Sequence, residues 1–341
     1  MPATPTVAVA LATFNGERFL REQLASLTAQ TVPPSEILIG DDGSTDATLD
    51  IVDEFADRSP IAVTVTRNPT RLGFADNFFA IAGRAQADLV AWCDQDDVWL
   101  PEKLERCAAA FRKPDVVLVV HGARRIDSAG TELDRLPGAL RRSYRKRSGH
   151  PFLVPYGFRE VFRRRLLDEF DPAERPESFH GLRTSHDEFV YFAASCSGTV
   201  RWIRRPLALY RAHDSNTTGA ARQPGVADQA MQHHGALIGA PEVAEFRASY
   251  LDAMARRQGD GDELRRAASW YRRYAASVDR RMSVYRATGR LGMLRAVASA
   301  SAGGLYAPRR RGRLGPQALA KDLALAVLRG GPVAHQSRAS A

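Results

Sequence analysis

The sequence contains few cysteines and no long apolar run. Its cysteines are Cys93, Cys107 and Cys196, an odd number at wide spacing. This spacing excludes a disulfide framework or zinc pattern, so we expect reduced, buried thiols of the kind common in cytosolic proteins. No apolar run approaches the ~20 residues that a membrane-spanning helix needs. No basic and then apolar leader precedes the apolar segment 7–12, so we expect a cytoplasmic protein without a secretion signal.

The chain has 341 residues and a net charge of +9, which is unevenly distributed. This length allows one large domain or two moderate ones. Basic residues cluster at 141–147 and at 309–313. One interpretation is a solvated, arginine-rich surface. The other is peripheral attraction to anionic lipid at the inner membrane face, at about 1 kcal/mol for each basic side chain. No nucleic-acid partner is expected, because zinc-finger and RNA-recognition signatures are missing.

The first 120 residues alternate between strand-like and helix-like patterns. Strands are predicted at 7–12, 37–39, 63–66, 89–93 and 116–120, and helices at 17–30, after Ser44 or Thr45, at 77–84 and from Pro101 to Phe111. This alternation predicts an α/β fold with a mainly parallel sheet and helices on both faces.

The pattern changes after residue 126. We expect a turn at 127–130 between short strands, an arginine-rich loop at 135–147, helices at 156–170 and 186–195, a strand pair within 198–210, mostly helix beyond 223, and a last amphipathic helix at 317–329. The predicted domains are 1–222, with halves at 1–122 and 123–222, then a helical extension at 223–330 and a disordered tail at 331–341.

Polar clusters follow three of the predicted strands. They are Thr13–Gly16, Asp41-Asp42 and Asp94-Gln95-Asp96-Asp97. Parallel sheets bind ligands at the carboxyl ends of their strands, so these clusters should meet in one crevice. Carboxylate oxygens favour Mg²⁺ or Mn²⁺, and an ion held by few protein ligands can also bind substrate phosphates. The pattern therefore indicates an enzyme that acts on a nucleotide diphosphate. The alternatives are ordinary strand-to-helix turns, with Asp97 as a helix cap.

Six motifs in order resemble family 2 glycosyltransferases, the nucleotide-sugar-dependent type with the GT-A fold. They are Ala12–Glu17, Gly40–Asp46, Asn68-x4-Gly73-x3-Asn77, Cys93–Asp97, Ser185–Asp187 and Tyr210–His213-x2-Asn216. The resemblance covers roughly residues 7–219. It is closest to bacterial rhamnosyltransferase-like enzymes of polysaccharide assembly.

The resemblance implies a set of ligand-binding residues. The predicted nucleotide-sugar contacts are Thr13, Asn15, Glu17, Asp41, Asp42, Asn77, Asp94 and Arg211, and the predicted ligands of Mg²⁺ or Mn²⁺ are Asp96 and His213. Asp41 would accept a hydrogen bond from the imide of uracil or thymine, which suits a carboxylate because it offers only acceptors. Arg211 would pair with phosphate oxygens. Phe14 would either stack on the base or fill the core.

The resemblance also places a general base at Asp187, with Glu188 as an alternative. Ser185-x-x-Glu188 is equally a helix capping box, and His186 could orient a substrate or occupy a turn. Phe189 fits the family pattern, whereas Pro155–Phe158 replaces the small polar pair that is usual on the acceptor side.

The resulting hypothesis is inverting, metal-dependent transfer of a hexose or deoxyhexose from a UDP- or dTDP-sugar to a hydroxyl. The acceptor would be a lipid-linked saccharide in cell-surface polysaccharide or glycolipid assembly. A nucleotidyltransferase is the first alternative, although residues 12–17 lack the basic loop that it needs after the first strand. A non-catalytic nucleotide-sugar-binding protein is the second.

Overall fold

The computed structural model describes residues 4–136, 143–147, 155–178, 183–214, 226–257, 261–287, 289–306 and 316–329. The chain divides into two compact units. The first, which we call the sheet unit, comprises residues 1–146, 151–175 and 184–223. The second, the helical unit, comprises residues 147–150, 176–183 and 224–341.

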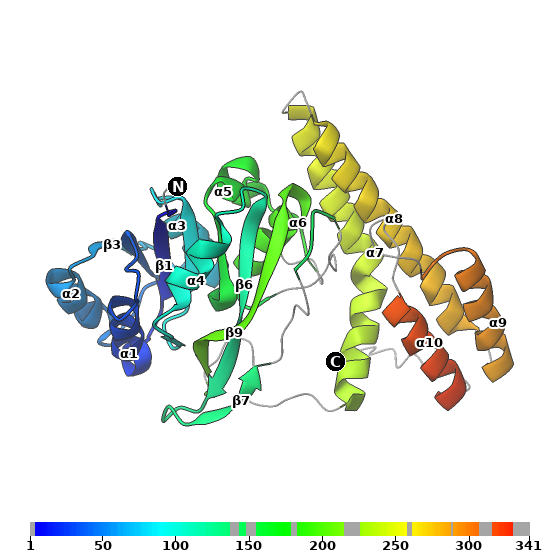
Figure 1. The fold of residues 1–341 in the computed structure, drawn as a ribbon, viewed down its shortest axis with the longest axis horizontal. Coiled ribbons are helices and arrows are strands. Elements are labelled where there is room, and N and C mark those ends of the chain that lie inside the picture. The colour runs from blue at the N-terminus through cyan, green and yellow to red at the C-terminus, as the bar shows by residue number, and fades with distance from the viewer. Residues whose placement is uncertain are drawn as a thin grey trace. The chain divides into compact units, whose positions relative to one another are not determined.

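The sheet unit is built on one mixed sheet (Figure 1). Its strands are β1 Val7–Thr13, β2 Glu36–Asp41, β3 Ala62–Arg67, β4 Leu89–Cys93, β5 Val98–Trp99, β6 Val116–Ile126, β7 Glu132–Leu136, β8 Glu160–Arg163 and β9 Thr199–Arg211. They lie in the order β3-β2-β1-β4-β8-β6-β9-β5, and β7 pairs with β6. The first four in this order are parallel, as is the β6–β9 pair, whereas β8 runs antiparallel to both neighbours. The predicted α/β class is confirmed.

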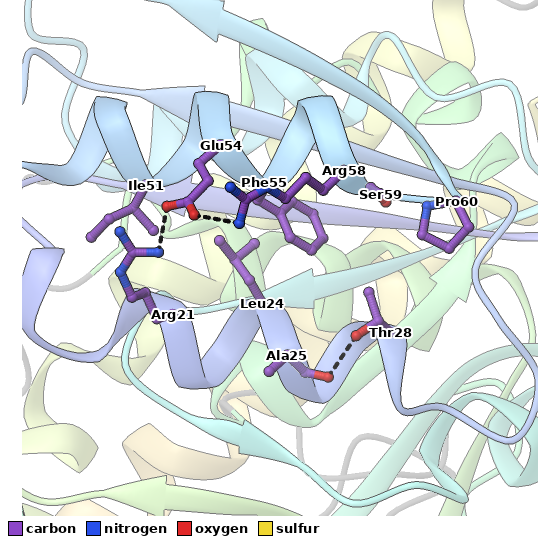
Figure 2. Close-up of a pocket in the computed structure, with 10 residues that line it drawn as sticks. All are labelled: Arg21, Leu24, Ala25, Thr28, Ile51, Glu54, Phe55, Arg58, Ser59 and Pro60. Atoms are coloured by element: carbon purple, nitrogen blue, oxygen red, sulfur yellow. Dashed lines mark hydrogen bonds and ion pairs between the residues drawn. The ribbon is translucent and has the colours of Figure 1, made fainter.

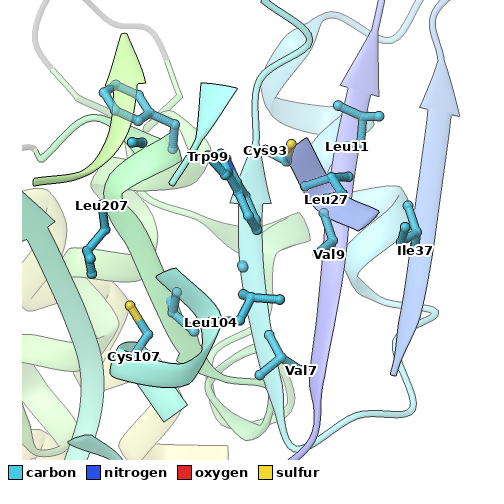
Figure 3. Packing of buried hydrophobic residues seen from close by; sticks show 14 of the residues in the cluster. Val7, Val9, Leu11, Leu27, Ile37, Cys93, Trp99, Leu104, Cys107 and Leu207 are labelled. Atoms are coloured by element: carbon cyan, nitrogen blue, oxygen red, sulfur yellow. The ribbon is translucent and has the colours of Figure 1, made fainter. Parts of the chain in front are cut away.

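Helices cover both faces of this sheet. They are α1 Glu17–Thr28, α2 Thr48–Arg58, α3 Phe74–Ala82, α4 Lys103–Ala110, α5 Arg165–Glu169 and α6 His186–Ser197. Odd-numbered residues of β1 and β4 pack against leucines of α1 and α4 in the buried cluster that Figure 3 shows. Trp92 is an even-numbered residue of β4, so its side chain lies on the other face of the sheet, where it contacts Phe78 of α3 and His186 of α6. Alternate burial on two faces explains why these strands are apolar throughout.

Two predictions after residue 150 were wrong. The helix expected at 156–170 is a 3₁₀ turn, Gly157–Arg159, followed by β8 and the five-residue helix α5. A four-residue apolar strand is too short for periodicity to separate it from a helix. The strand pair expected within 198–210 is the single strand β9. Register shifts at His121–Ala123 of β6 accommodate Pro206 in that long strand.

The other expectations for this region are met in part. Residues 127–130 form the predicted turn, closed by the Asp127 N–H donating to Thr131 O at 3.0 Å, and Gly130 has φ 89°. Arg135 and Leu136, where the loop was expected to begin, belong to β7 instead. Arg141 and Arg142 lie outside the described residues.

The helical unit contains α7 Val226–Arg257, α8 Asp262–Arg286, α9 Gly289–Ala302 and α10 Pro316–Arg329. These agree with the helical extension expected from the sequence. Arg281 of α8 donates two hydrogen bonds from Nε to buried Asp322 of α10, at 3.0 and 2.8 Å. Within the described ranges, no helix is both long and apolar enough to cross a bilayer. The cluster at 309–313 and the tail predicted at 331–341 lie outside those ranges.

Candidate functional site

The loops that follow β1 and β2 are joined by reciprocal hydrogen bonds. The Asn15 N–H donates to Ser44 Oγ at 2.9 Å, and Asn15 Oδ1 accepts from the Thr45 N–H at 2.8 Å. Glu17 Oε2 accepts from the Ala47 N–H at 2.9 Å. The predicted nucleotide contacts of Asn15 and Glu17 therefore stay predictions, whereas their role in holding these loops together is visible.

Asp41 and Asp42 are both buried and turn their oxygens toward the protein. Asp41 accepts from the Thr13 hydroxyl at 2.9 Å and from the Ser44 N–H at 2.9 Å. Asp42 accepts from the N–H groups of Leu72 and Gly73 at 2.6 and 2.7 Å. These carboxylates fix the backbone of two loops.

Asn77 is 1% exposed. Its Nδ2 donates to Gly40 O at 2.8 Å, and its Oδ1 accepts from Asn68 Nδ2 at 3.0 Å. The predicted contact of Asn77 with a nucleotide sugar is disfavoured by this geometry, since a ligand would have to displace both bonds.

Gln95, which sequence reasoning passed over, connects the first loop to the acidic segment. Its Oε1 accepts from the Phe14 N–H at 2.9 Å, and its Nε2 donates to Phe14 O at 3.0 Å. A Cβ on Gly16 would lie 2.3 Å from Gln95 Oε1, so glycine leaves room for this clamp. Arg71 was also missed, and its guanidinium lies 3.8 Å from the centroid of the Phe14 ring. The spacing of these residues along the chain gives no signal of either contact.

Three carboxylates gather at the end of β4. Burial, then the neighbouring charges of Asp96 and Asp187, raise the pKa of Asp94 to about 7. Burial raises the pKa of Asp97 as well. Asp97 Oδ1 accepts from the Arg211 N–H at 3.1 Å, and α4 has Glu102 at its N-cap. The alternative that Asp97 caps the helix after Pro101 is therefore wrong.

Asp96 and His213 meet across the site. His213 Nε2 lies 2.9 Å from Asp96 Oδ2, and the His213 ring packs 4.9 Å from that of Phe19. Within the part of the chain that the structure describes, no group of three or more His, Cys, Asp or Glu side chains could hold a metal ion. The structure thus brings together the two predicted metal ligands without adding a third protein ligand.

The predicted phosphate contact of Arg211 is opposed by the geometry. Arg211 is 2% exposed, and its Nε donates to the backbone oxygen of Asp96 at 3.0 Å. Its Nη2 pairs with Glu22 at 2.5 Å. A guanidinium that is buried and bonded in this way holds the acidic segment in place and does not present its fork to a ligand.

Asp187 lies in the first turn of α6 and is partly exposed. Its Oδ1 accepts from the Ser185 hydroxyl and, at 2.8 Å, from the Glu188 N–H. Ser185 makes no side-chain cap bond, so the capping-box alternative does not form. Glu188 is 7% exposed, which disfavours it as the base. The charge of Asp187 raises the pKa values of both Asp94 and Glu160, which places these three carboxyl groups in one electrostatic environment.

Buried ionisable groups also lie near these carboxylates, and the sequence pattern did not predict them. Lys103 Nζ donates to Phe158 O at 2.8 Å and lies 3.2 Å from the centroid of the Trp99 ring. Burial lowers the pKa of Lys103 to about 7. His186 stacks on Phe78 with centroids 4.1 Å apart, and burial lowers its pKa, so its role is packing. The three cysteines are buried, as expected, and none of them is in a disulfide.

A separate hollow lies between α1 and α2 (Figure 2). Glu54 there accepts hydrogen bonds from Arg21 and Arg58, each at 2.7 Å. None of the predicted site residues lines it, so we assign it no part in the chemistry.

Comparison with solved structures identifies the fold. The solved structure of Staphylococcus aureus TarS residues 1–349 in complex with UDP-GlcNAc superposes with a TM-score of 0.52 at 17% identity, covering 78% of this chain and 91% of that one. This likeness, with the sheet order described above, identifies the GT-A fold.

Residues 8–170, just under half of the chain, match the model of glycosyl transferase family 2. An uncharacterized glycosyltransferase of Nostoc sp. is 29% identical over 217 residues, covering 62% of this chain and 66% of the relative. The dTDP-rhamnosyl transferase RfbG of Shigella flexneri is 26% identical over 225 residues, covering 62% and 74%. The chain spans just under two thirds of the Nostoc relative and 57% of an uncharacterized Mycobacterium tuberculosis protein.

Proposed function

We propose that this protein transfers a hexose or deoxyhexose from a nucleotide diphosphate carrier to a hydroxyl group, with inversion at the anomeric carbon. The observation that carries the proposal is the convergence of Asp94, Asp96, His213 and Asp187, contributed by β4, β9 and α6 with the segments that adjoin them. Asp96 and His213 are 2.9 Å apart, and Asp187 raises the pKa of Asp94 by like-charge repulsion. The match of residues 8–170 to the model of glycosyl transferase family 2 supports the reaction class.

Uridine or thymidine diphosphate is the proposed carrier. The Shigella relative is named a dTDP-rhamnosyl transferase, and TarS was solved with UDP-GlcNAc, which supports these two nucleotides. The loops fixed by Asp41 and Asp42 would form the wall of the nucleoside pocket, with Phe14 and Arg71 as the stacked pair nearest to it.

Asp96 and His213 would hold Mg²⁺ or Mn²⁺. A carboxylate oxygen and an imidazole nitrogen are suitable donors for Mn²⁺, and few protein ligands leave positions for phosphate oxygens. When bound, such an ion neutralises charge on the departing diphosphate as a Lewis acid. Arg211 supports Asp96 from behind through the 3.0 Å bond to its backbone oxygen.

Asp187 is the proposed general base. The acceptor oxygen attacks the anomeric carbon from the face opposite the diphosphate, and its proton passes to Asp187. The bond between the anomeric carbon and the diphosphate oxygen breaks, and the nucleotide diphosphate leaves with the electron pair. Partial exposure of Asp187 allows an acceptor hydroxyl to reach it, and the Ser185 hydroxyl and the Glu188 N–H hold it in place.

The proposed acceptor is a lipid-linked saccharide in polysaccharide or glycolipid assembly, handled by a cytoplasmic protein at the inner membrane face. Residues 1–222 would carry out the transfer, and residues 223–330 would serve as an extension. The relative named a rhamnosyl transferase supports this setting only by its name.

A panel of UDP- and dTDP-sugars with Mn²⁺ or Mg²⁺ tests the proposal, read as a shift in melting temperature and as released nucleotide diphosphate. A bound donor stabilises the folded state by mass action. We expect one donor to raise the melting temperature and to be slowly hydrolysed in the presence of the metal. Binding without any hydrolysis or transfer would favour a non-catalytic protein, and release of pyrophosphate from a nucleoside triphosphate would favour a nucleotidyltransferase.

A further inference from the structure

The positive charge of the chain resides in its C-terminal third. Residues 1–222 contain 29 Lys and Arg against 30 Asp and Glu, a net charge of −1. Residues 223–341 contain 19 basic against 9 acidic residues, a net charge of +10. Acidic residues elsewhere in 1–222 therefore offset the positive charge of the basic cluster at 141–147.

Helix α9 in this basic part has two distinct faces. Met293 and Val297 are buried at 1% and 2% exposure. Leu291 and Leu294, by contrast, are 62% and 37% exposed. At 100° per residue, Leu291 lies about 140° and Leu294 about 80° from the middle of the buried pair, so Leu291 is opposite that pair and Leu294 is on the flank.

Basic side chains lie beside these leucines. Arg295 is exposed and lies on the side of Leu291, whereas Arg290 is exposed in the first turn, about 40° from the middle of the buried pair. The helix contains no acidic residue. Arg286, which ends α8, is exposed as well. We call Arg290, Leu291, Leu294 and Arg295 the outer face of α9.

We propose that the outer face of α9 docks on an anionic lipid surface. Exposed leucines with an arginine at each end of the segment match the chemistry of a bilayer interface, where the leucines enter the headgroup boundary and the long arginine side chains reach the lipid phosphates. This inference deepens the proposed membrane contact and moves it away from the cluster at 141–147. It does not require that the transfer reaction be correct.

An anionic membrane accounts for both components of the face. Charge alone would suit a nucleic acid, but two exposed leucines gain nothing against a phosphate backbone. Leucines alone would suit a second copy of the chain, but two like-charged helical units would repel each other. Only a surface that is both negative and apolar beneath its headgroups is complementary to both sets of side chains.

Flotation of the full-length protein with lipid vesicles tests this inference without any donor or acceptor. The vesicles contain phosphatidylcholine alone or with about one third phosphatidylglycerol, an anionic lipid. We expect binding only to the anionic vesicles. The double variant Arg290→Gln/Arg295→Gln should weaken binding by about 30-fold, since each basic residue near the surface contributes about 1 kcal/mol. The variant Leu291→Ser/Leu294→Ser should weaken it by at least about tenfold at unchanged net charge.

Matched controls come from the sheet unit. Arg201→Gln/Arg204→Gln removes two exposed arginines and so produces the same change in net charge, and Leu133→Ser removes a leucine that is 50% exposed. Both controls should bind as the parent does, and circular dichroism checks that every variant is folded. Equal losses in the arginine controls, or unchanged binding of the leucine variant, would overturn the inference. So would binding to a DNA duplex that is lost in step with vesicle binding, or a change of mass in light scattering caused by the leucine variant.

Discussion

Two groups of acidic side chains follow the strands of this sheet, and they differ in whether their oxygens accept hydrogen bonds from the protein or lie beside other carboxylates. After β1 and β2, the oxygens of Asp41 and Asp42 accept from the Thr13 hydroxyl and from backbone N–H groups within the protein. After β4, Asp94 and Asp96 lie beside other carboxylates, and Asp94 has a pKa raised to about 7.

This difference separates residues that shape the site from residues that act in it. A carboxylate that accepts backbone N–H bonds is stabilised in its charged form and has little capacity left for a ligand. Several carboxyl groups close together repel one another and cost free energy unless a cation or ligand neutralises them. Such groups, with perturbed pKa values, cluster at functional sites. We therefore assign the chemistry to the second group and the architecture to the first.

The largest expected effect is that of Asp187→Asn. The amide cannot take up the acceptor proton, so transfer should fall by about 10³-fold, within the range for general bases. Donor binding, measured by calorimetry, should remain near the parent value. Ser185→Ala, which removes only the hydroxyl donor to Asp187, should cost much less. Transfer at the parental rate by the asparagine variant would exclude Asp187 as the base.

Asp96→Asn should have the next largest effect. Loss of one anionic ligand should lower turnover by about 10²-fold and raise the Mn²⁺ concentration needed for half activity. His213→Gln should move the same metal requirement in the same direction, because Nε2 lies 2.9 Å from Asp96 Oδ2. If both variants keep the metal response of the parent, the two residues do not bind the ion.

Asp42→Ala should show the opposite profile, with a loss of stability and a modest change in rate per folded molecule. It leaves the N–H groups of Leu72 and Gly73 without their acceptor, at a cost of about 2 kcal/mol in the free energy of unfolding. Urea denaturation measures this loss. Asp57→Ala, which removes an exposed carboxylate of α2, is the control. A normal stability with abolished donor binding would show that Asp42 contacts the nucleotide directly.

Sequence reasoning located the strands because an apolar run followed by polar residues is a local signal. β4 ends at Cys93 as predicted, whereas β1 and β2 extend beyond their predicted ends, to Thr13 and Asp41. It did not find β8, since a four-residue strand has no readable period, nor the contacts of Gln95 and Arg211. Those contacts join segments about 80 or more residues apart, and only the folded chain shows which polar atoms are already bonded.

The smallest expected effect is on stability and depends on pH. Glu160 of β8 is fully buried, and neither of its oxygens has a hydrogen-bond partner among the described residues. Burial first, then the charge of Asp187, raise the pKa of Glu160, whereas Arg159 lowers it. The folded protein therefore holds a proton that the unfolded chain releases. Because the unfolded chain binds fewer protons, stability falls as pH rises above the ordinary carboxyl pKa of about 4.3.

Glu160→Gln removes this penalty while keeping the shape of the side chain. The variant should match the parent near pH 4 and exceed it by about 1 kcal/mol in the free energy of unfolding near pH 8, as measured by urea denaturation across that range. Glu105→Gln, on the exposed side of α4, is the control that should show no such trend. A variant that is less stable than the parent at pH 8 would mean that Glu160 is ionised and paired in the fold. The distinction between carboxylates that are hydrogen-bonded within the protein and carboxylates that lack such partners would then fail at Glu160, where it is strongest.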